Sequence, residues 1–273
     1  MTSRELHDWI VLNTEAGHSP EALLEKLLQA GWSETVALDA LEGVLRSRAA
    51  ELGVVTVPEP DLIGSPTSVT VGGKQVDLML SIRSPRLVVF RKFLSDEECD
   101  AVIEAARPRL AASTVIDNDS GANAMHGGRV SEGMFFARCE SPLIRNIEER
   151  ISELVRWPLD HGETIQVLRY GIGGKYDPHY DYFDPAIPGS VEPIRVAGNR
   201  VGTLIMVLKA PVRGGSTLFP DAGVEVFAQK GNAVFFSYDR PVASTKTLHG
   251  GAPVVEGEKW IATKWFREKP FNA

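Results

Sequence analysis

The stretch that decides the fold is Tyr176-Asp177-Pro178-His179-Tyr180-Asp181-Tyr182-Phe183. It lies in the second half of a 273-residue chain, among short apolar segments that Gly and Pro clusters separate. His179 and Asp181 stand two positions apart, and residues i and i+2 of an extended strand project from the same face of a sheet. An imidazole and a carboxylate side by side on one strand are two ligands of a single metal site. The segment therefore predicts a sheet that binds a metal.

A third metal ligand has to come from another segment, and His249 in Thr247-Leu248-His249-Gly250-Gly251 is the best candidate. Two histidines and one carboxylate form the facial triad of non-haem Fe(II) oxygenases, which leaves positions on the metal open for a cosubstrate and O₂. A zinc hydrolase usually carries a separate base such as the Glu of HExxH, and this sequence contains no HExxH. A chance His-x-Asp pair and a structural histidine are the alternatives.

Lys259 follows ten positions after His249, in Gly257-Glu258-Lys259-Trp260. The residues that follow it have the apolar pattern of a buried strand. A lysine that faces inward needs an anionic partner, because an isolated buried charge is costly. A dicarboxylate cosubstrate supplies such a partner in its distal carboxylate. The alternative is a strand lysine that faces solvent.

Residues 71–273 contain both helical and strand-like patterns. Ser95 is expected to open a helix that runs to about Leu110, and Pro142–Leu154 has apolar residues at helical spacing. Short strands are expected near residues 87–90, 163–170, 202–208, 224–227, 233–238, 246–252 and 260–267. Many short strands beside two helices predict an α+β fold with a double-stranded β-helix (a jelly-roll, cupin-like core) flanked by helices.

The first fifth of the chain has a different character. Residues 1–50 are expected to form a small all-α region of about three helices, which begin near Ser3, Ser19 and Ser33. Residues 51–70 are rich in Pro and turn formers and are expected to be a linker. The short helices either pack on the remaining chain or serve as a module for a protein partner or for self-association.

Composition excludes several classes of protein. The formal net charge of −7 has the wrong sign for a general electrostatic nucleic-acid binder. Cys99 and Cys139 form no CxxC, which excludes a disulfide scaffold and a cysteine-rich zinc site. No apolar run reaches the ~18 residues of a membrane span, and the acidic N-terminus lacks the apolar region of a secretory signal. A cytoplasmic protein without a membrane or nucleic-acid partner is expected.

Several segments occur together in a fixed order: Gln166–Tyr170, Tyr176–Phe183, Gly214–Pro220, Lys230–Phe236, His249–Val254 and Gly257–Trp265. With them the chain, from about residue 85 to 268, resembles the 2-oxoglutarate- and Fe(II)-dependent dioxygenases of the prolyl 4-hydroxylase alpha-subunit type. The resemblance implies hydroxylation of prolyl residues in a peptide or protein, coupled to decarboxylation of 2-oxoglutarate to succinate. It implies Fe(II) as cofactor, 2-oxoglutarate and O₂ as cosubstrates, and ascorbate as a further candidate. The alternative substrate is a free amino acid or another small molecule.

The resemblance also implies roles for single residues. His179, Asp181 and His249 correspond to the iron ligands, and Lys259 to the anchor of the 2-oxoglutarate C5 carboxylate. Tyr170 and Thr203 are expected to line the cosubstrate pocket. The expected substrate-side residues are Arg129, Ser131, Glu163, Tyr176, Arg200 and Trp265, with Arg129-Val130-Ser131 in a mobile loop over a peptide groove. Aromatic packing is the alternative role for Tyr176 and Trp265, and a solvated charge for Glu163 and Arg200. The Pro- and Gly-rich loop 184–199 is expected to shape substrate choice.

Overall fold

The computed structural model describes residues 3–51, 57–62, 64, 66–112, 115–116, 123–124, 130–227 and 229–272. The chain divides into two compact units, Met1–Thr56 and Val57–Ala273. Most of the expected loop 117–131 lies outside the described residues, and Arg129 is among the residues that are not described. Within the described ranges, no helix combines the length and the apolar character that crossing a membrane requires.

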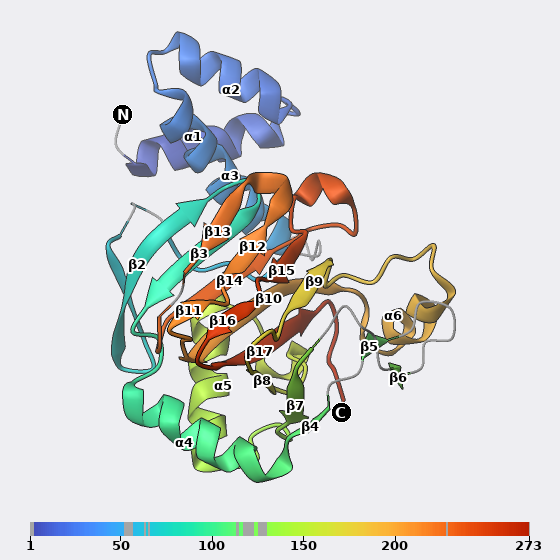
Figure 1. Ribbon diagram of the computed structural model, residues 1–273. Helices are drawn as coiled ribbons and strands as arrows, with labels where there is room; N and C mark the ends of the chain where they lie inside the picture. Colours follow the sequence, from blue (N-terminus) through green and yellow to red (C-terminus); the bar gives the residue numbers. More distant parts are fainter. Residues whose placement is uncertain are drawn as a thin grey trace. The chain divides into compact units, whose positions relative to one another are not determined.

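The first unit consists of three helices around a small core of their own (Figure 1). Ser19 caps the second helix by accepting a hydrogen bond from the Ala22 N–H at 3.3 Å, and Pro20 occupies the first helical position. Leu and Ile side chains at helical spacing supply the buried centre. The helices are α1 (Ser3–Glu15), α2 (Pro20–Gln29) and α3 (Glu34–Glu51).

The predicted linker 51–70 is wrong at its C-terminal end. Ser68–Val71 forms strand β1, which pairs with β2 (Lys74–Ile82) at the edge of the large sheet. Pro58 and Pro60 are buried, and the Glu59 N–H between them donates a hydrogen bond of 2.8 Å to the Val155 carbonyl. The prolines that suggest a linker in the sequence therefore pack as apolar side chains on the second unit.

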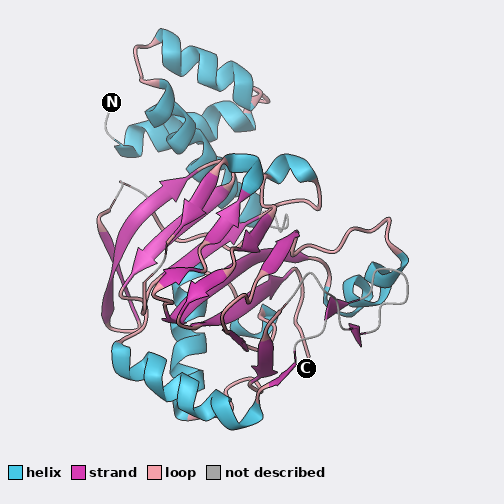
Figure 2. Cartoon of the chain, in the orientation of Figure 1, coloured by secondary structure: helices cyan, strands magenta, loops and turns pink. Residues whose placement is uncertain are grey.

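The second unit contains one large antiparallel sheet of nine strands (Figure 2). Its central strands are rich in β-branched and aromatic residues, which fit a sheet with both faces covered. In spatial order the strands are β1, β2, β3 (Arg86–Arg91), β14 (Ala233–Ser237), β10 (Arg200–Lys209), β17 (Lys259–Arg267), β8 (Gln166–Tyr170), β7 (Glu132–Phe135) and β4 (Ala111–Ala112).

A smaller antiparallel sheet of four strands faces the large one, and apolar side chains from both fill the space between them. Its strands are β13 (Val224–Val226), β12 (Thr217–Phe219), β15 (His249–Gly251) and β9 (Tyr176–His179). Two further pairs are β11 (Arg213–Gly214) with β16 (Val254–Glu256), and β5 (Val115–Ile116) with β6 (Asn123–Ala124). Two facing sheets of short antiparallel strands confirm the predicted jelly-roll core.

The other face of the large sheet is covered by α4 (Asp96–Ala106) and α5 (Pro142–Val155). Ser95 and Glu98 form a complete capping box at the start of α4, as the Ser-x-x-Glu spacing predicts. The expected helix ends four residues early, because a 3₁₀ turn at Arg107–Arg109 follows Ala106. The predicted loop 184–199 is partly wrong, since it contains helix α6 (Val191–Ala197) with Pro193 in its first turn.

Strand alternation decides which side chains reach the space between the sheets. Along β17, Trp260 belongs to the core under the helices, whereas Lys259 and Ile261 line a cavity on the inner face. Along β10, Leu204 faces the helices and Thr203 faces inward in the same way. The period of two thus delivers a lysine and a hydroxyl to the interior of the jelly roll.

Candidate metal centre and cosubstrate pocket

Two histidines and an aspartate meet at one end of the small sheet. Strands β9 and β15 pair in a register that places His179 opposite His249. The His179 Nε2 lies 3.6 Å from Asp181 Oδ1, and the His249 Nε2 lies 3.4 Å from Asp181 Oδ2. One ligand atom from each residue falls within 4.8 Å of the others, which is close enough to hold a metal ion. The His-x-Asp spacing singled out His179 and Asp181, and the strand-like segment before Gly250-Gly251 singled out His249. Strand β9 ends at His179, so Asp181 lies beyond the strand.

The backbone fixes the orientation of both imidazole rings. The His179 Nδ1 is 2.9 Å from the Asp177 carbonyl oxygen, and the His249 Nδ1 is 3.0 Å from the Thr247 carbonyl oxygen. A carbonyl only accepts hydrogen bonds, so in each neutral ring the proton sits on Nδ1 and the lone pair on Nε2. The two Nε2 atoms that face Asp181 therefore carry the lone pairs that can coordinate a metal. Hydrogen-bond partners on the other ring nitrogen impose this arrangement on histidine metal ligands.

Burial and charge set the protonation states that metal binding needs. Burial lowers the pKa of His249 to about 4, so the ring is neutral near pH 7. Burial alone would raise the pKa of Asp181, but the neighbouring His249 and His179 outweigh it and hold the pKa of that carboxyl well below its usual range. A carboxylate and neutral imidazoles suit Fe(II), whereas cysteine-rich sites suit zinc or iron–sulfur clusters. The donor set thus fits Fe(II).

A cavity continues from the triad between the sheets to Lys259. Lys259 is 6 % exposed, and burial lowers the pKa of its ammonium group to about 8. It pairs in register with Tyr170 on β8, and its Nζ lies 5.8 Å from the centre of that ring. No acidic side chain in the described part of the chain forms an ion pair with it. The other lining residues are mostly apolar or small: Leu168, Tyr176, Thr203, Ile205, Thr217, Gly250, Gly251, Ile261, Thr263 and Trp265.

The structure brings four of the remaining predicted site residues to this cavity: Tyr170, Thr203, Tyr176 and Trp265. Tyr176 stacks on the His179 ring with 3.8 Å between centroids. The indole Nε1 of Trp265 is buried and has no hydrogen-bond partner among the described residues. Thr203 does more than line the pocket, because its hydroxyl donates a hydrogen bond of 2.7 Å to Asp181 Oδ2.

Glu163 and Arg200 do not line the cavity. Glu163 is 8 % exposed, and its carboxylate accepts two hydrogen bonds from Arg200, at 2.7 and 2.8 Å, and one from Arg267 at 3.0 Å. Arg200 stacks on Trp265 at 4.1 Å and donates to the Asp181 backbone carbonyl at 3.3 Å. The alternative of a solvated charge is therefore wrong for both residues. Their expected contact with substrate stays a prediction, because neither side chain lines the cavity and both belong to a buried cluster with Arg267.

Sequence reasoning missed three residues of this region. Thr217 lines the cavity and lies within the Gly214–Pro220 segment, so its segment was recognised but its side chain was not. Arg267 completes the buried charge cluster, and Tyr238 places its hydroxyl 3.1 Å from the Thr203 hydroxyl. No local pattern marks Arg267 or Tyr238, because each contact joins residues that are distant in the sequence. Of the predicted loop residues, Ser131 is half-buried just before β7.

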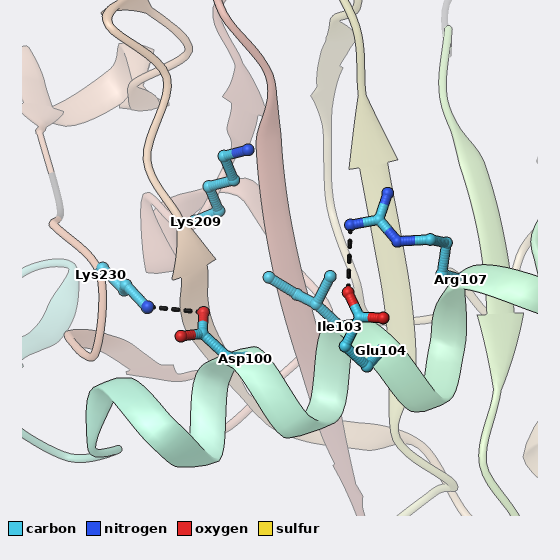
Figure 3. A pocket seen from close by; sticks show the side chains of 6 residues that line it. All are labelled: Asp100, Ile103, Glu104, Arg107, Lys209 and Lys230. Carbon is cyan, nitrogen blue, oxygen red and sulfur yellow. Dashed lines mark hydrogen bonds and ion pairs between the residues drawn. The ribbon is translucent and has the colours of Figure 1, made fainter.

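A larger hollow of about 310 Å³ lies beside α4, away from the metal ligands (Figure 3). Lys230 pairs with Asp100 at 2.6 Å across it, and Arg107 pairs with Glu104 at 3.4 Å. Lys209, the third cation of the lining, pairs with Glu258 at 2.7 Å. Because acidic side chains of the protein already neutralise these cations, the hollow offers no free charge to a ligand.

Comparison with known proteins agrees with this geometry. Residues 165–267 match the 2OG-Fe(II) oxygenase superfamily. Probable prolyl 4-hydroxylase 4 of Arabidopsis thaliana is 37 % identical over 256 residues, which cover 85 % of this chain and 83 % of the relative. Prolyl 4-hydroxylase 1 of the same plant is 40 % identical over 204 residues, which cover 68 % of this chain and 70 % of the relative.

A solved structure gives the same result. The viral collagen prolyl hydroxylase from Paramecium Bursaria Chlorella virus-1, determined as its 2OG complex, is 32 % identical with a TM-score of 0.51. The match covers 66 % of this chain and 95 % of the viral one. A jelly roll with a His-Asp-His cluster defines a 2-oxoglutarate-dependent dioxygenase, an enzyme that uses Fe(II), 2-oxoglutarate and O₂. Within that class, the chain belongs to the prolyl 4-hydroxylase family.

Proposed function

We propose that this enzyme hydroxylates prolyl residues in a peptide or protein, with His179, Asp181 and His249 as its iron ligands. One observation carries the assignment of the site: a largely buried His-Asp-His cluster lines the same cavity as Lys259, which is buried and has no ion-pair partner among the described residues. The prolyl specificity is supported by the relatives, whose names describe prolyl 4-hydroxylases, and by the collagen prolyl hydroxylase structure.

The residues around the cavity would divide the work of catalysis. His179, Asp181 and His249 would hold Fe(II), and the bound metal would supply activation of O₂ coupled to oxidative decarboxylation of 2-oxoglutarate. The Lys259 ammonium binds the distal carboxylate of 2-oxoglutarate, since it is a buried cation for which the described part of the chain supplies no carboxylate. Leu168, Ile205 and Ile261 give this part of the cavity an apolar wall, which limits water and strengthens the charge pairing.

A peptide substrate finds a hydrogen-bond donor on the metal side of the cavity. The Trp265 indole N–H is buried and unpaired among the described residues, so a carbonyl of the substrate would satisfy it. Arg200, stacked on the Trp265 ring and held by Glu163, keeps the indole in place. Arg129 and Ser131 remain predictions as contacts of the peptide.

The test is 2-oxoglutarate turnover by the Fe(II)-loaded enzyme with three matched substrates: a proline-containing peptide, the same peptide with Ala in place of Pro, and free proline. We expect succinate formation and a +16 Da product with the first alone. A product from free proline would instead support the small-molecule alternative. Unchanged turnover in His179→Ala would contradict the iron site.

A cytoplasmic location and a requirement for ascorbate are also part of the proposal. Cys99 and Cys139 are both free, which suits a reducing compartment. Ascorbate would return adventitiously oxidised iron to the Fe(II) state. The expected result is a progressive loss of turnover when ascorbate is omitted and recovery when it is added, with fractionation of the source cells testing the location.

A further inference from the structure

Three side chains form a buried hydrogen-bond chain that ends on the aspartate of the metal centre. The Thr203 hydroxyl lies 2.7 Å from Asp181 Oδ2 and 3.1 Å from the Tyr238 hydroxyl. Thr203 is completely buried, and Tyr238 is 3 % exposed. A threonine hydroxyl has one proton, and an ionised carboxylate only accepts hydrogen bonds. Thr203 therefore donates to Asp181, and Tyr238 donates to Thr203.

We propose that Thr203 and Tyr238 are positioning residues, which hold the Asp181 carboxylate in the orientation that binds the metal through one oxygen. The proposal rests on the assignment of Asp181 as an iron ligand under Proposed function. Tyr238 acts through Thr203, since among the described residues its hydroxyl is hydrogen-bonded to the Thr203 hydroxyl, and it is Thr203 that hydrogen-bonds to Asp181.

The hydrogen bonds from Tyr238 to Thr203 and from Thr203 to Asp181 have a specific effect on the carboxylate. A carboxylate binds a metal through either one oxygen or both. The hydrogen bond from Thr203 occupies a lone pair of Oδ2 and restricts rotation of the group, whereas Oδ1 faces the His179 Nε2 at 3.6 Å. Binding through one oxygen keeps the further positions of a facial triad open for 2-oxoglutarate and O₂. Loss of the hydroxyl would free the carboxylate to rotate.

Burial makes the two hydroxyls hard to replace. Neither Thr203 nor Tyr238 has the solvent exposure that would let bulk water take over a missing donor. Phe236 and Phe219 contact the His249 ring, so apolar side chains cover that side of the ligand cluster. Outer partners of this kind typically contribute about 10–100-fold to metal affinity.

The experiment measures Mn(II) affinity by calorimetry, because Mn(II) reports on the site without turnover. Thr203→Val removes the hydroxyl at constant shape, and we expect affinity to fall about 10–100-fold. Thr203→Ser keeps a hydroxyl and should stay near the parent value. Tyr238→Phe should weaken binding to a lesser degree. The double variant Thr203→Val with Tyr238→Phe should match Thr203→Val alone, since Tyr238 acts only through Thr203.

Matched controls separate the inference from the proposed function. Tyr180→Phe removes a hydroxyl that contacts Asp221 at 3.2 Å instead of Thr203, so it should leave Mn(II) affinity unchanged. Thermal unfolding of each variant identifies any loss of fold, with Thr203→Ser and Tyr238→Phe as the mildest changes.

Loss of binding in Asp181→Ala with parent-like affinity in Thr203→Val would overturn the inference and leave the iron site standing. Retained binding in Asp181→Ala would instead overturn the proposed function. If the losses of Mn(II) affinity in Thr203→Val and Tyr238→Phe add up in the double variant, the claim that Tyr238 acts through Thr203 is wrong.

Discussion

Lys259 makes the affinity for 2-oxoglutarate depend on pH. Its pKa in the free protein is lowered to about 8 by burial, so above pH 8 the amine is mostly neutral and must take up a proton to bind a carboxylate. We expect the KM for 2-oxoglutarate to rise toward about tenfold per pH unit above pH 8. Below pH 8 the KM should be flat, because the lysine is already charged.

Two variants of Lys259 check this assignment. Lys259→Ala removes a charged hydrogen bond worth about 1.5–3 kcal/mol, which corresponds to a KM about 10–100-fold higher. Lys259→Arg keeps its charge at every pH used, because guanidinium titrates above about 12. The rise of KM above pH 8 should therefore disappear in Lys259→Arg, whatever its absolute KM. The same rise in that variant would assign the pH dependence to another group.

Glu163 holds two buried guanidinium groups, so its removal should affect stability before it affects substrate binding. Burial alone would raise the pKa of Glu163, but Arg200 and Arg267 outweigh it and hold the pKa below its ordinary value. Glu163→Gln leaves excess positive charge in the core, and we expect a loss of about 3 kcal/mol in unfolding free energy. Urea denaturation measures this loss.

A matched surface pair provides the control for Glu163. Glu192 and Arg195 form an exposed i,i+3 pair at 2.6 Å, and Glu192→Gln should leave the midpoint of urea denaturation unchanged, because solvent screens an exposed pair. Unchanged stability together with a raised peptide KM in Glu163→Gln would restore the substrate role predicted from the sequence. Sequence reasoning named Glu163 and Arg200 but did not predict that Arg267 contacts Glu163. Arg267 lies more than sixty residues beyond Arg200, and only the fold brings it to the cluster.

At the scale of elements, the contact between β9 and β15 places the two histidines. Gly250 sits where the strands approach each other most closely, and a Cβ there would lie 2.8 Å from the Tyr176 carbonyl oxygen. Gly250→Ala should therefore push β9 away and reduce Mn(II) affinity at least about tenfold. Gly251→Ala is the matched control, because its Cβ would meet Tyr176 at an ordinary 3.6 Å. Equal affinities in the two variants would contradict this role of the strand contact.

Local patterns predicted the elements better than their ends. The His-x-Asp spacing predicted that His179 and Asp181 lie together, as they do in the structure, but Asp181 comes from the turn after β9 because the strand stops pairing at His179. Strand β17 matched its apolar pattern, and the structure decides between the two orientations that the sequence left open for Lys259, because the side chain points inward. Helix α6 was missed because its Pro and Gly surroundings are typical of a loop, although a proline in the first turn of a helix is tolerated.

For the whole molecule, the sequence separated a helical segment from a catalytic one without fixing where the first ends. The change from amphipathic helices to short strands is visible in the pattern, and the two compact units meet between Thr56 and Val57, inside the predicted linker. Burial of Pro58 and Pro60 could not be read from composition, because prolines are as common in linkers as on packed surfaces.

Each unit has its own core, which predicts that catalysis survives removal of the first. The core of Met1–Thr56 is formed by its own three helices, and every residue of the metal centre and the pocket lies in Val57–Ala273. A chain that starts at Val57 should keep its Mn(II) affinity and its peptide-stimulated turnover within about twofold, because it loses none of the ligands. A fall beyond tenfold in either measurement would show that the helices contribute to the catalytic unit.

The same truncation tests the predicted self-association through residues 1–50. Leu12 and Leu28 are exposed on α1 and α2, at 67 % and 41 %, so polar substitutions there test such a contact without removing a side chain of the helical core. If a second copy of the chain is that partner, sedimentation should show a dimer or larger oligomer for the full chain and a monomer for the chain from Val57. The double variant Leu12→Ser with Leu28→Ser should make the full chain monomeric. Monomers in both cases would rule out self-association. If the full chain then binds another protein that the chain from Val57 does not bind, the helices serve that partner instead.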